Sequence, residues 1–156
     1  MSLHTDLLAL LGEVGKTLDR LSDLAMVKVA AVRRDDLMAL DEVLRQEQAL
    51  ALALRGLDQK RDKLLAALDL TGVPLSALAD HCPKELQQQA REVAGRLRQQ
   101  YELYQTRAEV ARNTLEMNLH EIERVLDSMG VPRPESGGYQ PADPEPPRRM
   151  KTDFRA

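Results

Sequence analysis

The residues that could carry catalysis or bind a metal are few in this chain and widely separated. The single cysteine, Cys82, has only the adjacent His81 as a possible base, and the other histidines, His4 and His120, are far from it in the sequence. Metal sites need clustered ligands, and nucleophilic catalysis needs a base held beside the nucleophile. There is no Gly-x-Ser-x-Gly elbow and no glycine-rich phosphate loop. We therefore expect no catalytic residue, no metal site and no cofactor, and we interpret the chain as a binding protein and not an enzyme.

Three charged side chains, Lys28, Glu47 and Arg61, interrupt stripes of otherwise apolar residues. Charges in such positions either pair with one another or lie at the edge of the stripe, with the aliphatic stem buried and the charged head in water. In a helical hairpin that turns near Arg34, Lys28 falls opposite Asp41 and so has an acidic neighbour. We expect structural roles for these charges and no catalytic pair.

The composition favours one helical domain that works in the cytoplasm. The chain has 156 residues, of which 43% are hydrophobic and only 3% aromatic, and so few aromatics argue against a β-sandwich or barrel. A formal net charge of -3 offers no broad cationic surface for nucleic acid. The first residues lack the basic region of a signal peptide, and no stretch approaches the roughly 18 apolar residues of a membrane span. We expect a cytoplasmic protein that binds neither nucleic acid nor a small-molecule substrate.

Two apolar stripes with alternating spacings of three and four residues predict the first two helices. The first stripe runs over Leu7–Val32 and the second over Leu37–Leu68. Between them, Arg33-Arg34-Asp35-Asp36 puts cations where one helix ends and anions where another begins. This predicts a turn, and a single kinked helix is the alternative. Gly72 and Pro74 then end the second helix.

A third stripe predicts the longest helix of the chain. It opens at Pro83, which suits the first helical position because proline has no N–H to lose there. From Leu86 to Met129 the spacing of three and four residues continues without a break, and Asn118 is its only polar member.

The composition changes after Gly130. Six of the eight prolines lie within residues 131–156, together with few hydrophobic residues. Such a segment cannot bury enough apolar surface to fold by itself. We therefore expect residues 1–130 to form a helical domain and residues 131–156 to form a flexible, disordered tail.

The three predicted helices differ in length. At 1.5 Å per residue they span about 42, 50 and 70 Å. The fold that we predict is all-α: an elongated antiparallel three-helix bundle with coiled-coil-like packing, in which residues 83–117 lie against residues 36–70. Roughly the last twelve residues of the third helix then extend beyond the other two.

The protruding end carries an apolar face that the rest of the chain does not cover. Exposed faces of this kind usually mark interaction sites. The alternatives are a structural coiled-coil protein that associates with a second copy of itself, for example as a homodimer, and an adaptor protein. The residues that we expect to bind a partner protein are Leu115, Asn118, Leu119, Ile122, Val125, Leu126 and Met129.

Several motifs occur in a distinctive order along the chain. They are Gln46-Glu47-x-x-Leu50, Leu54-x-x-Leu57-x-x-x-Arg61-x-x-Leu64-Leu65-x-x-Leu68, Leu115-Glu-Met-Asn118 and Ile122-Glu-Arg-Val-Leu126, with Tyr139 in the polar segment that follows. In this order, over almost the whole chain, they resemble the FlgN family of flagellar type III export chaperones. One difference is that Gln140 stands where relatives often have a glycine after the tyrosine.

The resemblance implies a cytosolic bacterial chaperone that hydrolyses no ATP. It implies that the chain binds the hook-associated proteins of the hook–filament junction, through their C-terminal helical segments, and delivers them to the export gate. It also implies that Tyr139 docks on the cytoplasmic domain of the export-gate membrane protein.

Overall fold

The computed structural model describes residues 2–130, and within this range every regular element is a helix. Three long helices, α1 (Leu3–Arg33), α2 (Leu37–Ala67) and α3 (Gln87–Ser128), are joined by a turn and by a loop with two short 3₁₀ helices, η1 (Leu75–His81) and η2 (Lys84–Leu86). The all-α prediction is therefore confirmed. None of these helices is long and apolar enough to cross a membrane. The expected tail, residues 131–156, lies outside the described residues.

A true turn separates α1 from α2, so the alternative of one kinked helix is excluded. Asp35 has a left-handed backbone with φ 56°, and the Asp36 N–H donates to the Ala31 carbonyl at 2.9 Å. These features form a Schellman-type helix end. The Asp36 carboxylate then accepts a hydrogen bond from the Ala39 N–H at 3.0 Å and caps the start of α2. One residue thus helps to end the first helix and to begin the second.

The second helix ends before the glycine that was expected to follow it. Asp69 takes the left-handed conformation with φ 58°, and the Leu70 N–H donates to the Leu65 carbonyl at 2.8 Å. Leu70 is buried, as the apolar residue after such a helix end often is. Gly72, with φ 84°, lies farther along in the loop.

The start of the third helix also differs from the prediction. Pro83 precedes the 3₁₀ turn Lys84–Leu86, and the α-helix begins only at Gln87. The Leu86 N–H donates to the Pro83 carbonyl at 2.8 Å, which closes this tighter turn. Pro83 therefore precedes the first helical turn, but this turn is a 3₁₀ helix and not the start of the α-helix.

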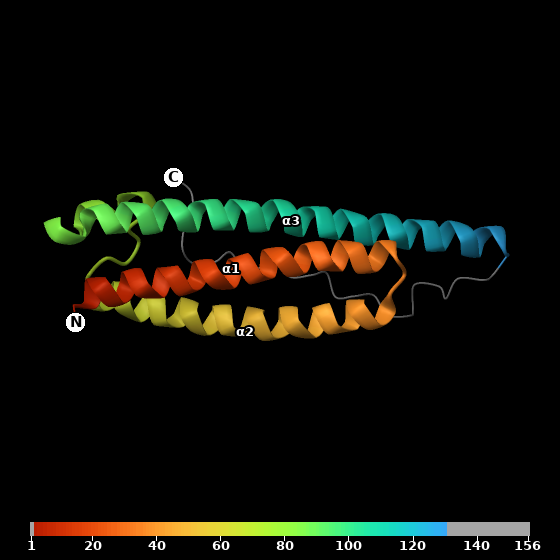
Figure 1. The fold of residues 1–156 in the computed structure, drawn as a ribbon, viewed down its shortest axis with the longest axis horizontal. Helices are drawn as coiled ribbons and strands as arrows, with labels where there is room; N and C mark the ends of the chain where they lie inside the picture. Colours follow the sequence, from red (N-terminus) through yellow and green to blue (C-terminus); the bar gives the residue numbers. More distant parts are fainter. Residues whose placement is uncertain (1, 131–156) are drawn as a thin grey trace.

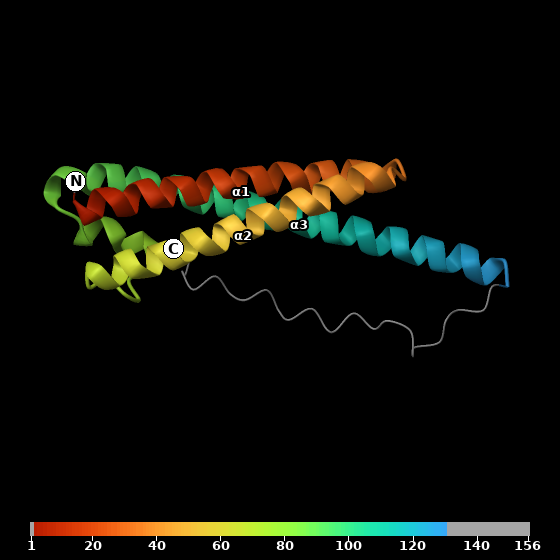
Figure 2. The same cartoon turned by 90° about the horizontal axis from the view of Figure 1, so that it is seen from below.

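Helix α1 is the central element of the bundle, and α2 and α3 both pack on it (Figure 1). Helix α3 runs parallel to α1 and antiparallel to α2. The expected close pairing of α3 with α2 is wrong, because the closest backbone contacts join α3 to α1 and α2 to α1. Figure 1 places α1 between α2 and α3, and in Figure 2 α3 is inclined to α1 so that its end diverges from the bundle.

The burial pattern explains why α1 is central. Thirteen of its residues are buried, against two in α2 and three in α3. Leu8 and Leu10 are among them although they lie off the predicted stripe. A helix that packs on two neighbours needs a wider apolar face than one stripe provides. The additional leucines of α1 supply that width.

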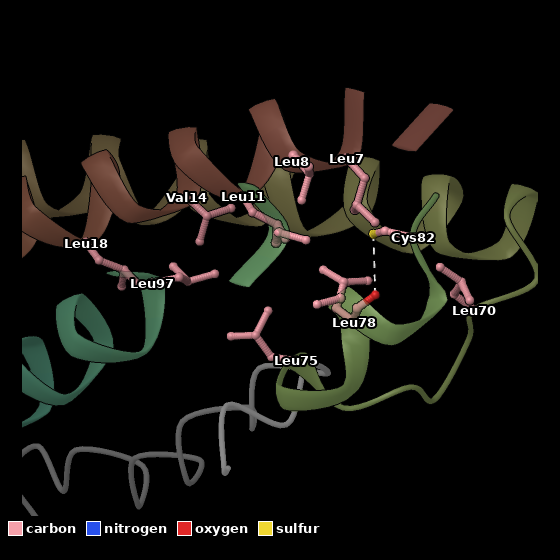
Figure 3. Packing of buried hydrophobic residues seen from close by; sticks show 12 residues of the cluster. Leu7, Leu8, Leu11, Val14, Leu18, Leu70, Leu75, Leu78, Cys82 and Leu97 are labelled. Carbon is pink, nitrogen blue, oxygen red and sulfur yellow. Dashed lines mark hydrogen bonds between the residues drawn. The ribbon is translucent and has the colours of Figure 1, made fainter. Parts of the chain in front are cut away.

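The core is concentrated at the end of the bundle where α1 begins (Figure 3). There Leu7 and Leu11 of α1 meet Leu75 and Leu78 of η1, and Leu97 of α3 packs on the same cluster. Toward the α1–α2 turn only a small cluster follows, which consists of Ala25, Val29 and Ala111. The hydrophobic core therefore contains fewer clustered residues near the α1–α2 turn than at the opposite end.

Polar contacts hold α3 in register with α1. Gln100 donates to the Asp19 carboxylate at 2.8 Å, and Arg107 pairs with Asp23 at 3.2 Å. Gln100 also lies against Gly15, where a Cβ atom would clash with its amide. Glycine thus leaves room on α1 for the Gln100 amide at this level.

The charges that interrupt the stripes have structural partners, but one partner differs from the prediction. Lys28 Nζ lies 2.8 Å from Glu47 Oε2 in a largely buried ion pair, whereas Asp41 pairs with Arg45 at 2.9 Å. Side chains lean toward the N-terminus of their own helix. The Lys28 side chain therefore points away from the turn, so it reaches Glu47 and not Asp41, which is nearer to the turn.

Arg61 is fully buried, with 1% of its surface exposed. It pairs with Asp58 on the same helix and lies 3.9 Å from Asp62. Its Nε and Nη1 have no hydrogen-bond partner in the part of the chain that the structure describes, and burial lowers the pKa of its guanidinium. A cavity of about 20 Å³ lies beside it, lined otherwise by leucines and Val73.

Candidate functional site

The end of α3 projects past the α1–α2 turn (Figures 1 and 2). Its large apolar side chains are exposed there. Leu119 is 56% exposed, Ile122 49%, Val125 51%, Leu126 36% and Met129 69%. No described segment therefore covers this end of α3, which we call the overhang and define as residues 116–130.

An open groove of about 610 Å³ lies between α3 and the α1–α2 turn. Its α3 wall includes four of the seven residues predicted to bind a partner: Asn118, Ile122, Val125 and Leu126. Leu115, Leu119 and Met129 are not among the lining residues. The groove is open to solvent, so a segment of another chain can enter it.

Sequence reasoning missed part of this groove. The additional lining residues are Val32, Arg33, Asp35, Thr114, Met117 and Glu121. The end of α1 contributes Val32 and Arg33, and the turn contributes Asp35. Only the packing of α3 on α1 places these residues beside the overhang. Thr114 and Glu121 do have a sequence signal, because each lies one helical turn from Asn118.

Asn118 is half-buried in an otherwise largely apolar part of α3. Its side chain makes no hydrogen bond to another described residue, although it lines the groove. An amide can both donate and accept hydrogen bonds. Asn118 can therefore bind a polar group of a molecule that enters the groove.

The described residues offer no assembled catalytic group. Cys82 is buried, and its Sγ donates to the Leu78 carbonyl at 3.4 Å. Burial raises the pKa of the Cys82 thiol, which disfavours the nucleophilic thiolate. Within residues 2–130, no group of three or more His, Cys, Asp or Glu side chains is arranged to hold a metal ion.

Tyr139, the residue expected to dock on the export gate, lies outside the described residues. Its role stays a prediction. The groove and the overhang, in contrast, lie wholly within the described part of the chain.

The fold is a helical bundle with an open groove beside the projecting end of its third helix. The family profile described as FlgN protein matches residues 1–144, and the chain belongs to this family of flagellar export chaperones. The resemblance noted in the sequence is thus confirmed, and the family is one of chaperones and not of enzymes. No match was found among curated proteins or among solved structures.

Proposed function

We propose that this chain binds the hook-associated proteins of the hook–filament junction and delivers them to the type III export gate. The exposed apolar overhang beside an open groove is the observation that supports this role most directly. An amphipathic terminal helix of the substrate would lie in the groove and cover the overhang. The bound segment could then not associate with other subunits before export.

The site can supply enough energy for tight and reversible binding. Burial of roughly 600 Å² of apolar surface at about 25 cal/mol/Å² contributes about 15 kcal/mol to the free energy of binding before the opposing entropic terms are included. Ordering of the substrate helix and loss of its translational freedom offset most of this. Release at the gate would therefore need no nucleotide.

The tail has the second role in this proposal. Tyr139 would dock on the cytoplasmic domain of the export-gate membrane protein, since a tyrosine can fill an apolar pocket while its hydroxyl is hydrogen-bonded. Substrate binding and gate docking would then use different parts of the chain. Each part can be tested without the other.

The double substitution Ile122→Asp and Leu126→Asp tests the groove. Both side chains are partly exposed in the free chain, so helicity measured by far-UV circular dichroism should change little. Binding of a hook-associated protein, measured by calorimetry, should be lost because the partner helix would have to bury two carboxylates. Leu52→Asp with Leu103→Asp is the matched control, since these leucines are 68% and 43% exposed and lie away from the groove.

Two results would count against the proposal. Unfolding of the double variant would mean that the overhang is part of the core. A stable homodimer that binds no hook-associated protein, and that the same double substitution dissociates, would mean that the overhang serves self-association.

A further inference from the structure

The sign of the charge on α3 changes where the helix leaves the bundle. Residues 87–115 carry five arginines and three glutamates, which gives a net charge of +2. Residues 116–130 carry four carboxylates and one arginine, which gives -3. The acidic excess therefore coincides with the overhang.

The cations of the packed part of α3 are partly used within the protein. Arg107 pairs with Asp23 on α1, and Arg98 pairs with Glu102 on α3. In the overhang, Glu116 and Glu121 form no ion pair with any residue in the described range. Glu121 lines the groove directly. The overhang thus presents negative charge that its own fold does not neutralise.

The C-terminal end of α3 adds to this negative field. Helix α3 ends at Ser128, in the overhang, whereas at the turn the end of α1 at Arg33 is opposed by the start of α2 at Leu37. The C-terminal end of a helix carries a partial negative charge that favours nearby cations. On the turn side of the groove, Arg33 and Asp35 compensate each other in charge. Glu121 then remains as the uncompensated charge among the lining residues, so the lining of the groove carries a net negative charge.

We infer that the groove takes an amphipathic helix whose apolar stripe is bordered by lysine or arginine. This inference rests on the proposed function and specifies the chemistry of the partner. The apolar stripe covers Ile122, Val125 and Leu126, and the flanking cations lie near Glu116, Glu121 and Glu123. A second copy of this chain is the poorer occupant, since it would bring two overhangs of charge -3 together.

Two synthetic helical peptides test the inference on the full chain. They share one leucine stripe and differ only in their flanking residues, which are lysine in one and glutamate in the other. Fluorescence anisotropy should give the lysine peptide a Kd about tenfold lower in 50 mM salt, since several exposed ion pairs of modest strength act together. In 300 mM salt this ratio should fall toward one, because salt screens exposed charges.

Substitutions in the protein test which glutamates cause the preference for the lysine peptide. Glu116→Gln, Glu121→Gln and Glu123→Gln together should remove most of the preference for the lysine peptide. The matched control is the triple variant Glu92→Gln, Glu102→Gln and Glu109→Gln, whose glutamates are exposed on the packed part of the same helix. This control should leave the preference for the lysine peptide unchanged.

The outcomes separate this inference from the proposed function. Equal binding of both peptides, reduced by Ile122→Asp with Leu126→Asp, would overturn the charge preference and leave the groove as the binding site. A preference that the control triple variant abolishes would also overturn it. Binding of neither peptide would overturn the groove as a helix-binding site and, with it, the inference.

Discussion

Replacement of the buried Arg61 by methionine should stabilise the bundle. The guanidinium has 1% of its surface exposed, and its Nε and Nη1 lack partners among the described residues. An unsatisfied buried donor costs about 1–3 kcal/mol. Methionine is shorter but of similar volume, carries no charge and is flexible enough to pack beside the cavity of about 20 Å³ next to Arg61. Buried ion pairs that are replaced by apolar residues of similar volume are often neutral or more stable by about 1–4 kcal/mol.

The stabilisation by Arg61→Met depends on whether the carboxylates of Asp58 and Asp62 can be hydrated without the guanidinium. The side chain of Asp58 is 22% exposed and that of Asp62 is 39% exposed, so both can be hydrated once the cation is gone. We therefore expect Arg61→Met to raise the free energy of unfolding by about 1–2 kcal/mol. Asp58→Ala should act in the opposite direction and cost about 3 kcal/mol, because it leaves the buried guanidinium without its main partner.

Urea unfolding followed by circular dichroism measures both effects. With a slope of about 1.5 kcal/mol/M, the midpoint should rise by about 1 M for Arg61→Met and fall by about 2 M for Asp58→Ala. A loss of more than about 2 kcal/mol in Arg61→Met would refute this reasoning. It would show that the free donors of Arg61 are satisfied in solution, for which an ordered water in the adjacent cavity is the simplest explanation.

Two further predictions concern α1 and the tail. Gly12→Ala should stabilise the protein by about 0.5–1 kcal/mol, because beyond the neighbouring residues and the backbone of its own helix no described atom lies within 4 Å of a Cβ there, whereas Gly15→Ala should gain little because the new Cβ displaces Gln100. Urea unfolding of the two variants tests this difference, and an equal gain in both would contradict the close approach at Gly15. Tyr139→Ala should leave binding of hook-associated proteins unchanged and reduce their export; normal swimming of a strain with this variant would disprove the docking role.

The sequence by itself was sufficient to predict the helices, because their apolar residues recur at helical spacing. The three long helices and the turn near Arg34 follow from periodicity and from the charges around that turn. The projection of α3 follows from lengths alone, since each residue adds the same rise. The family was likewise recognisable from the order of motifs, and the match over residues 1–144 confirms it.

Only the tertiary structure decided which helix packs on which. Periodicity identifies one apolar face per helix, but it does not say which partner covers that face. The burial of Leu8 and Leu10 makes α1 central, and this places α3 on α1 instead of on α2. The same packing puts the α1–α2 turn beside the overhang and so adds Val32 and Arg33 to the groove. The pairing of Lys28 with Glu47 also depends on the tertiary structure. Which charged side chains meet is set by the register of the two packed helices and by the direction of their side chains.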